Sequence, residues 1–124
     1  MSEPELIPNK INELSKWLKI LGDPKRLLVL ENIIKGVQCN CEMGDTLNMA
    51  PNLISHHLGI LRASGLVNAE RDQTDSRWIY YSINTPAMQE IRALFMDFFD
   101  PERIEPRKLT CGPQTDSASS SPSC

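Results

Sequence analysis

The spacing of apolar residues changes in the middle of this chain, from a helical period before residue 65 to a period of two directly after it. Before the change, proline residues and an Asp-Pro pair mark helix starts and glycines mark helix ends, which predicts helices over 9–21, 24–35, 41–47 and 51–65. After the change, two β-rich segments flank a polar turn, and a Thr-Pro pair begins a last helix. These later segments are 66–71, 77–83 and 85–99. The order predicts a mainly α fold with one β-hairpin.

The predicted helices are amphipathic, and the apolar stripe of the fourth helix marks its expected buried face. The stripes contain Ile11, Leu14, Leu18 and Leu21 in the first helix, Ile54, His57, Leu58 and Leu61 in the fourth, and Met88, Ile91, Phe95 and Phe98 in the last. We expect His57 to be a partly buried histidine whose hydrogen bonds are satisfied. We expect Trp78 and Tyr80 to face the core, because they lie on the opposite face of their strand from Arg77.

Length and composition limit the class of protein. A chain of 124 residues is long enough for one domain, which we expect over 1–100, and the Ser- and Pro-rich segment 101–124 is expected to be a flexible tail. No apolar run is long enough for a transmembrane helix and no secretory signal is visible, so we expect a cytoplasmic protein. Because the net charge is −3, any binding to DNA has to come from a local patch.

The order of elements is typical of a winged helix-turn-helix, in which the third and fourth helices form the reading unit and the hairpin forms the wing. On the fourth helix, Asn52, Ser55 and His56 point away from the predicted core and carry groups that reach bases or phosphates from a major groove. Arg71 and Arg77 flank the turn of the wing and are candidates for phosphate or minor-groove contacts. A solvated polar helix explains each residue taken alone, and it is the order of elements that favours DNA binding.

The cysteines are the second informative feature. Cys39 and Cys41 form a C-x-C pair, and residues two apart on a helix differ by about 200° of rotation. Both thiols therefore reach one ion only if Cys39 precedes the third helix and Cys41 lies in its first turn. A helix N-terminus lowers the pKa of a thiol, which favours thiolate ligands over two small buried side chains. Cys111 is a candidate third ligand, whereas Cys124 is expected to be incidental.

Four parts of the sequence carry a specific resemblance to a known family: LKILGDPKRLLVLENIIKG, the C-x-C pair, LISHHLGILRASGLV and RWIYYSIN. Over about residues 10–99 the chain resembles the ArsR/SmtB family of winged-helix metalloregulators, and within it the arsenical-resistance repressors. The resemblance implies a homodimer, joined through its first and last helices, that binds operator DNA and releases it when a toxic metal or metalloid binds. It also implies that Cys39 and Cys41 belong to the effector site and that As(III) is the inducer.

Two departures from the family pattern concern the ligands. The common arsenic motif has a further cysteine three residues after the second, and Gly44 occupies that position here. Cys111, from the same or the partner subunit, is therefore our candidate for the third thiolate. Some family members bind zinc through Asp and His on the last helix, but 85–99 contains no histidine, so we do not expect that site. Sb(III), Cd(II), Pb(II) and Zn(II) stay open as alternatives to As(III).

Other classes of function are weighed against the same residues. An enzyme is disfavoured, because the chain has no Gly-rich phosphate loop and no C-x-x-C motif, and Ser55 and His56 point to different sides of a helix. A repressor that senses oxidants is a rival interpretation, in which Cys39 or Cys41 forms a disulfide with Cys111. A protein–protein adaptor with a degenerate winged helix is a third interpretation.

Overall fold

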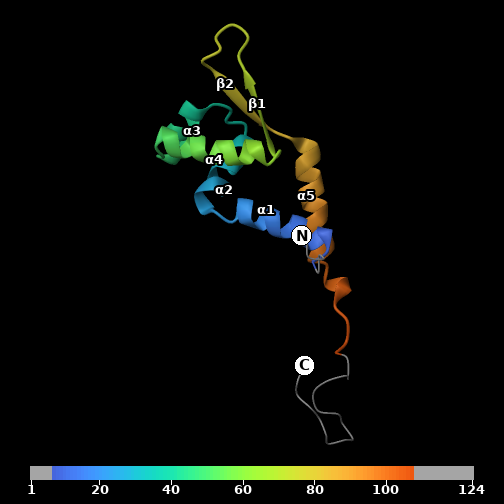
Figure 1. The fold of residues 1–124 in the computed structure, drawn as a ribbon. Helices are drawn as coiled ribbons and strands as arrows, with labels where there is room; N and C mark the ends of the chain where they lie inside the picture. The colour runs from blue at the N-terminus through green and yellow to red at the C-terminus, as the bar shows by residue number, and fades with distance from the viewer. Residues whose placement is uncertain (1–6, 108–124) are drawn as a thin grey trace, which may run out of the picture.

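The computed structural model describes residues 7–107 and contains there five α-helices and one antiparallel hairpin (Figure 1). In chain order the elements are α1 (Asn9–Leu21), α2 (Pro24–Ile34), α3 (Asn40–Leu47), α4 (Pro51–Ala63), β1 (Val67–Arg71), β2 (Ile79–Ile83), α5 (Thr85–Phe98) and a short 3-10 turn, η1 (Pro101–Arg103). The predicted winged helix-turn-helix is confirmed. Helices α2 and α4 end one or two residues early, because Gly36 and Gly65 take positive φ angles that end the helical path. The boundary between domain and tail at residue 100 stays a prediction.

Side-chain caps and prolines determine where the helices begin. Asp23 accepts hydrogen bonds from two backbone N–H groups in the first turn of α2, at 2.9 and 3.2 Å, and Pro24 follows it. Asn84 caps α5 in the same way, through a 3.3 Å bond from a backbone N–H. Ala50 offers α4 no such cap, so the position of that helix start depends on Pro51.

The core lies where α4 meets α2, α3 and the base of the hairpin. Ile54, Leu58 and Leu61 on one face of α4 are at most 1% exposed, and Met43 of α3 and Val29 of α2 are fully buried beside them. Burial of each such side chain contributes about 1.5–3 kcal/mol to stability. One face of α4 is thus held in the core, and its opposite face is exposed.

The hairpin extends beyond the helical body (Figure 1). Strands β1 and β2 pair along their whole lengths as the only sheet among residues 7–107. Because no further layer of these residues covers the outer face, Trp78 and Tyr80 are 44% and 37% exposed, and the prediction that they face the core is wrong. The partly buried face of β2 carries Ile79 and Tyr81 instead.

Helices α1 and α5 pack against each other beside the core (Figure 1). Leu14 and Trp17 are the buried residues of α1, and Ile91 is the buried residue of α5. An exposed ion pair joins the two helices, with Lys10 Nζ 2.9 Å from Asp97 Oδ2. The pair of helices thus has one buried seam, and other apolar side chains of the two helices lie exposed outside that seam.

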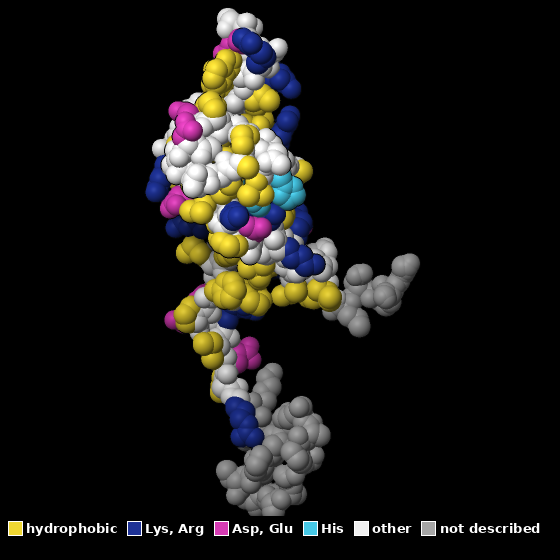
Figure 2. Space-filling view, turned by 90° about the vertical axis from the view of Figure 1, so that its left-hand side faces the viewer, with side chains coloured by type: hydrophobic (Ala, Val, Ile, Leu, Met, Phe, Trp, Pro, Cys, Tyr) yellow, Lys and Arg dark blue, Asp and Glu magenta, His cyan; other side chains and the backbone are white. Residues whose placement is uncertain are grey.

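The two helices and the adjoining segments leave a large apolar surface exposed, and Figure 2 shows hydrophobic side chains gathered in this part of the molecule. Its exposed residues are Ile7, Ile11, Leu18, Met96, Phe98, Phe99 and Ile104. Ile11, Leu18 and Phe98 belong to the predicted apolar stripes of the first and last helices, and no other described layer of the single chain covers them. Among the described residues, no helix is both long enough and apolar enough to cross a membrane.

His57 is more deeply buried than predicted and lacks the expected partners. It is 3% exposed, and neither ring nitrogen has a hydrogen-bond partner. Burial lowers the pKa of His57 from its usual value, against the opposing effect of the Asp23 carboxylate and with a smaller lowering by Arg26 and His56. The prediction of satisfied hydrogen bonds is wrong, because α4 turns this ring into the apolar core.

The burial of His57 predicts a specific dependence of stability on pH. Because the folded state favours the neutral ring, the unfolded chain binds the proton more readily, and the free energy of unfolding should fall as the pH drops below about 6.5. The slope contributed by this single proton is at most about 1.4 kcal/mol per pH unit. His57→Leu should lack this contribution in urea unfolding between pH 7.5 and 5. His56→Leu, at the exposed neighbour, is the control and should keep it; equal slopes in wild type and His57→Leu would contradict the argument.

Candidate functional site

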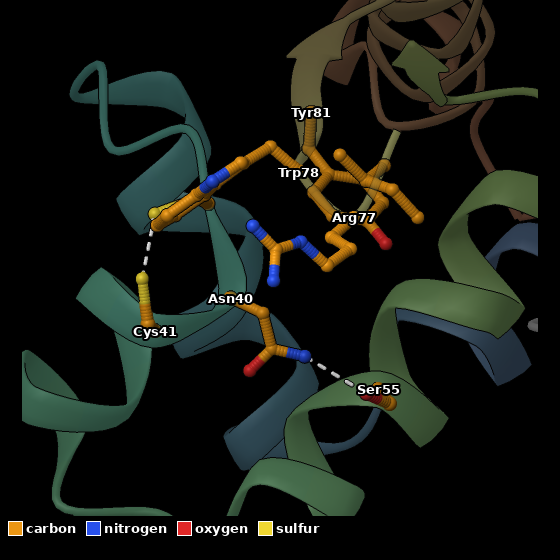
Figure 3. A pocket seen from close by; sticks show the side chains of 8 residues that line it. Asn40, Cys41, Ser55, Arg77, Trp78 and Tyr81 are labelled. Carbon is orange, nitrogen blue, oxygen red and sulfur yellow. Dashed lines mark hydrogen bonds between the residues drawn. The ribbon is translucent and has the colours of Figure 1, made fainter. Parts of the chain in front are cut away.

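The two thiols of the C-x-C pair lie together at the start of α3. Cys39 is the N-cap residue and Cys41 is the second residue of the helix. Their Sγ atoms are 3.0 Å apart, with the Cys39 side chain buried and Cys41 exposed to solvent (Figure 3). The two sulfurs are close enough to share one ion, because each metal–sulfur bond is about 2.3 Å long and the sulfurs lie on the same side of the helix start.

Glu42 organises the backbone around the thiols. Its Oε1 accepts hydrogen bonds from the backbone N–H of Gln38 and of Cys39, each at 3.3 Å, and from the Cys39 thiol at 3.3 Å. The bond from the Cys39 thiol and those from the two backbone N–H groups lower the pKa of Glu42. The carboxylate therefore holds the loop before α3 in place through three donors.

The pKa of the Cys39 thiol is raised to about 11, contrary to the lowering expected at a helix N-terminus. Burial is the largest cause, followed by the hydrogen bond with Cys41, and the bond from the thiol to the Glu42 carboxylate adds to it. In this arrangement burial and a neighbouring anion outweigh the helix dipole. Cys39 is thus a neutral thiol at pH 7, and an ion that binds it has to displace a proton.

A cleft of about 540 Å³ opens beside the thiols. The start of α3 supplies Cys39, Asn40 and Cys41, α4 supplies Ser55, and the hairpin supplies Arg77, Trp78, Ile79 and Tyr81. Figure 3 shows that Arg77 and Trp78 extend from the hairpin toward the start of α3. The site is therefore built from three elements that meet at one point.

Two hydrogen bonds tie the thiol segment to the other elements of the cleft. Asn40 Nδ2 donates to Ser55 Oγ on α4 at 2.8 Å (Figure 3). The backbone N–H of Tyr81 on β2 donates to the backbone carbonyl of Gln38 at 2.8 Å. A shift of the C-x-C segment thus acts on both α4 and the hairpin.

The candidate DNA-contacting residues of α4 share its exposed face. Asn52, Ser55 and His56 are all exposed, whereas Ile54 and His57 on the other side are buried. Ser55 is already bonded to Asn40, so it connects this face to the thiol site. A row of short polar groups on an exposed helix is what base-edge contacts from a major groove require.

The two wing arginines are held by local partners. Arg71 Nη1 donates to the backbone carbonyl of Ser76 at 2.7 Å. Arg77 makes a two-pronged pair with Asp75, through Nε to Oδ1 at 2.9 Å and Nη2 to Oδ2 at 2.8 Å, and its side chain lines the cleft. The structure thus brings Arg77 to the thiol site. Alternate residues of a strand share one face, so the spacing of Arg77, Ile79 and Tyr81 is the sequence signal for this placement.

The source of a third ligand lies outside the described residues. Cys111 and Cys124 fall beyond residue 107, so the structure does not place them. Within residues 7–107 there is no cluster of three or more His, Cys, Asp or Glu side chains suited to hold a metal ion. Gly44 contributes no side chain at the position of the usual third cysteine, so α3 supplies two thiols.

Comparisons with known proteins agree with this architecture. The family described as "Bacterial regulatory protein, arsR family" matches residues 23–69, from α2 to β1. An uncharacterized HTH-type transcriptional regulator of Methanocaldococcus jannaschii is 35% identical over 83 residues, which are 66% of this chain and 90% of that protein. The arsenical resistance operon repressor of Staphylococcus aureus is 32% identical over 79 residues, 64% of this chain and 73% of that repressor.

A solved structure gives the same result. The crystal structure of a possible transcriptional regulator for arsenical resistance superposes with a TM-score of 0.59 at 27% identity and covers 68% of this chain and 85% of that one. The resemblance inferred from the sequence segments is confirmed. These relatives are transcriptional regulators, which also confirms that the fold and sequence are not those of an enzyme.

Proposed function

Since this chain belongs to the arsR family of bacterial regulatory proteins, we propose that it is a metalloid-responsive repressor that binds operator DNA as a homodimer and leaves it when As(III) binds Cys39 and Cys41. Membership of the family itself makes the chain a DNA-binding transcriptional repressor with a winged helix. The observation that carries the finer proposal is the pair of sulfur atoms 3.0 Å apart at the edge of an open cleft.

The chemistry of the site supports a soft ion. Thiolates prefer soft and borderline ions such as As(III), Sb(III), Cd(II), Pb(II) and Zn(II) over hard cations. The similarity to an arsenical resistance repressor favours As(III) among them. A pyramidal As(III) centre takes three sulfur ligands, so Cys111 remains our candidate for the third.

The homodimer is supported by the apolar surface on α1 and α5. Exposed side chains such as Leu18, Phe98 and Phe99 form a surface that a single chain leaves in water. A contiguous apolar surface of this kind typically marks a protein interface. In a symmetric dimer the same surface of each chain covers the other, and two α4 helices are then presented to two half-sites of an operator.

The release of DNA requires a mechanical route from the thiols to α4. Three neutral thiols that lose their protons to As(III) form a neutral centre, so repulsion of phosphate does not trigger release. The bond from Asn40 to Ser55 connects the start of α3 to the exposed face of α4, and the bond from Tyr81 to Gln38 connects it to the hairpin. An ion that binds both sulfurs replaces their mutual contact and the bond from the Cys39 thiol to Glu42, and the resulting shift of the segment acts on these bonds and biases the orientation of the reading helix.

The DNA interface predicts two different mutational signatures. Asn52→Ala should relax base preference at one operator position by about 1–3 kcal/mol, because a base-edge contact is lost. Arg77→Ala should weaken binding to all sequences and lower the salt slope by about one, because a phosphate contact is lost. Fluorescence-anisotropy titrations at several salt concentrations measure both. Lys19→Ala removes the same charge from α1, outside the helix-turn-helix and the wing, and is the control; an unchanged affinity and slope in Arg77→Ala would make the wing assignment wrong.

The thiol assignment predicts that Cys39→Ser and Cys41→Ser each bind operator DNA within about twofold of wild type and no longer release it with arsenite. The thiols bind the effector and not the DNA, so only the response is lost. Gel-shift titration with arsenite measures it. A serine variant that dissociates at the wild-type arsenite concentration would refute the assignment.

Two shortened chains serve as the control for the tail in this experiment. A chain cut after Thr110 lacks Cys111 and should lose the arsenite response, whereas a chain cut after Asp116 retains Cys111 and should respond normally. If both respond like the full chain, Cys111 has no role in sensing. Ordering of the tail costs conformational entropy, so its loss should change effector affinity and leave DNA affinity unchanged.

The bond between Asn40 and Ser55 predicts a variant in which binding and release are uncoupled. Asn40→Ala should bind arsenite with wild-type stoichiometry by mass spectrometry but require at least ten times more arsenite for half-release of DNA. Gln38→Ala is a matched control, because the bond from Tyr81 uses the backbone carbonyl of residue 38 and survives the substitution. Wild-type release by Asn40→Ala would show that the signal takes another route.

The contact between the sulfurs also favours a second candidate function, an oxidant-responsive repressor. Thiols 3.0 Å apart are close enough for oxidation of one to be resolved by another, with Cys111 as a further partner. Peroxide-dependent release that dithiothreitol reverses would support this function, and arsenite-dependent release under anaerobic conditions supports the first.

A further inference from the structure

The thiol site has two unequal parts among the described residues. On one side it offers two sulfur ligands, Cys39 and Cys41, and no third His, Cys, Asp or Glu completes a cluster with them. On the other side lies a cleft of about 540 Å³, far more than a bare ion fills. An effector that occupies both parts therefore needs a further chemical group, attached to the atom that binds sulfur.

We propose that this cleft takes trivalent arsenicals with one organic substituent, R–As(OH)₂, in preference to arsenite, with the arsenic on Cys39 and Cys41 and the substituent against Trp78 and Tyr81. This proposal rests on the proposed function and names the class of its effector. The arsenic atom of such a compound needs two sulfur ligands, because carbon already occupies the third position. The absence of a thiol at Gly44 then contributes to the preference for an organic arsenical over arsenite.

The exchange reaction balances without a further reactant. R–As(OH)₂ and two Cys–SH groups give R–As(S–Cys)₂ and two molecules of water. Two As–O bonds break, two As–S bonds form, the thiol protons leave in the water, and arsenic stays trivalent. Arsenite, As(OH)₃, in the same two-sulfur site keeps one As–OH group, which faces the apolar side of the cleft unless a third thiol replaces it.

The hairpin side of the cleft suits an apolar substituent. Trp78, Ile79 and Tyr81 present two aromatic rings and an aliphatic group there. Trp78 is 44% exposed, so much of its indole surface is free to cover a ligand. A cavity of about 150 Å³ already holds benzene in a protein, so a phenyl group fits within this volume. Aromatic rings pack favourably on one another in offset or edge-on arrangements.

Three polar side chains of the cleft already have partners, which gives its aromatic side chains a larger share of the recognition surface. Arg77 is paired with Asp75 through two bonds, and Asn40 is bonded to Ser55. A ligand that sits between them therefore gains more from the aromatic surface than from new hydrogen bonds. The cleft thus favours a neutral, carbon-bearing arsenical over a small polar one.

The experiment uses the full chain with Cys111→Ser and Cys124→Ser, so that Cys39 and Cys41 are the two thiols present. The probes are phenylarsonous acid, C₆H₅As(OH)₂, and arsenite. Phenylarsonous acid should release operator DNA at the wild-type concentration, and arsenite should require at least ten times more. Native mass spectrometry should show one C₆H₅As unit per chain with the loss of two hydrogens, a readout that does not depend on DNA.

Substitution of the aromatic wall tests where the substituent lies. In the same background, Trp78→Ala should require at least ten times more phenylarsonous acid for half-occupancy by mass spectrometry and leave arsenite binding unchanged. Tyr80→Ala removes an exposed aromatic ring from the other face of β2 and should change neither. The matched pair separates a specific contact in the cleft from a general weakening of the hairpin.

The outcomes distinguish the two proposals. If neither arsenical releases DNA from the wild-type chain, the proposed function is wrong and this inference falls with it. If arsenite and phenylarsonous acid release DNA at equal concentrations from the two-thiol chain, or if Trp78→Ala binds both normally, the proposed function stands and the preference for an organic substituent is overturned.

Discussion

The packing of α4 into the core is the constraint on which the rest of the structure depends. Ile54, Leu58 and Leu61 are at most 1% exposed, and Met43 of α3 and Val29 of α2 pack against the same face. A close-packed interface of this kind shifts between discrete arrangements and does not deform continuously. Because α4 also presents the exposed polar face that we propose contacts DNA, a change at α3 reaches that face through this packing and the bonds at its edge.

A rearrangement at the start of α3 costs less free energy than a rearrangement of the α4 packing. The backbone at the start of α3 is held by the Glu42 carboxylate and by the Tyr81 amide on β2, and the Asn40 side chain is bonded to Ser55 on α4; these are polar contacts at or near the surface. Each such hydrogen bond contributes about 0.5–1.5 kcal/mol, far less than the combined burial of the α4 face. Under the proposed function, an effector that binds both thiols would therefore rearrange this segment while the core stays intact.

The sequence predicts the elements well because local signals determine them. The Asp23-Pro24 and Thr85-Pro86 pairs place two helix starts, and Gly36 places a helix end. These signals act within a few residues of the chain, so a single sequence contains all the information they carry. The change of period at residue 66 likewise requires no knowledge of distant contacts.

The failures concern properties that arise only when distant segments meet. Leu18 and Phe98 fit an apolar stripe, but the stripe does not tell whether the same chain or a second copy covers it. Periodicity predicts that His57 lies at the core, but it does not predict whether the ring nitrogens find hydrogen-bond partners there. The raised pKa of Cys39 follows from burial and from the hydrogen bond with Cys41, which together overturn the argument from the helix terminus alone.

Because Arg77 lies beside the thiols, the charge of a bound effector affects the contacts that this arginine makes in the hairpin. Arg77 lines the cleft and is held by Asp75 in the turn of the hairpin. Under the proposed function, Cd(II) on three thiolates would leave a net negative centre that competes with Asp75 for the guanidinium, whereas a neutral arsenic centre would not. A charged centre would therefore act on the wing through Arg77, and a neutral arsenical through the bonds of the Gln38 and Asn40 segment. The charge of the bound centre would then decide which of these contacts moves.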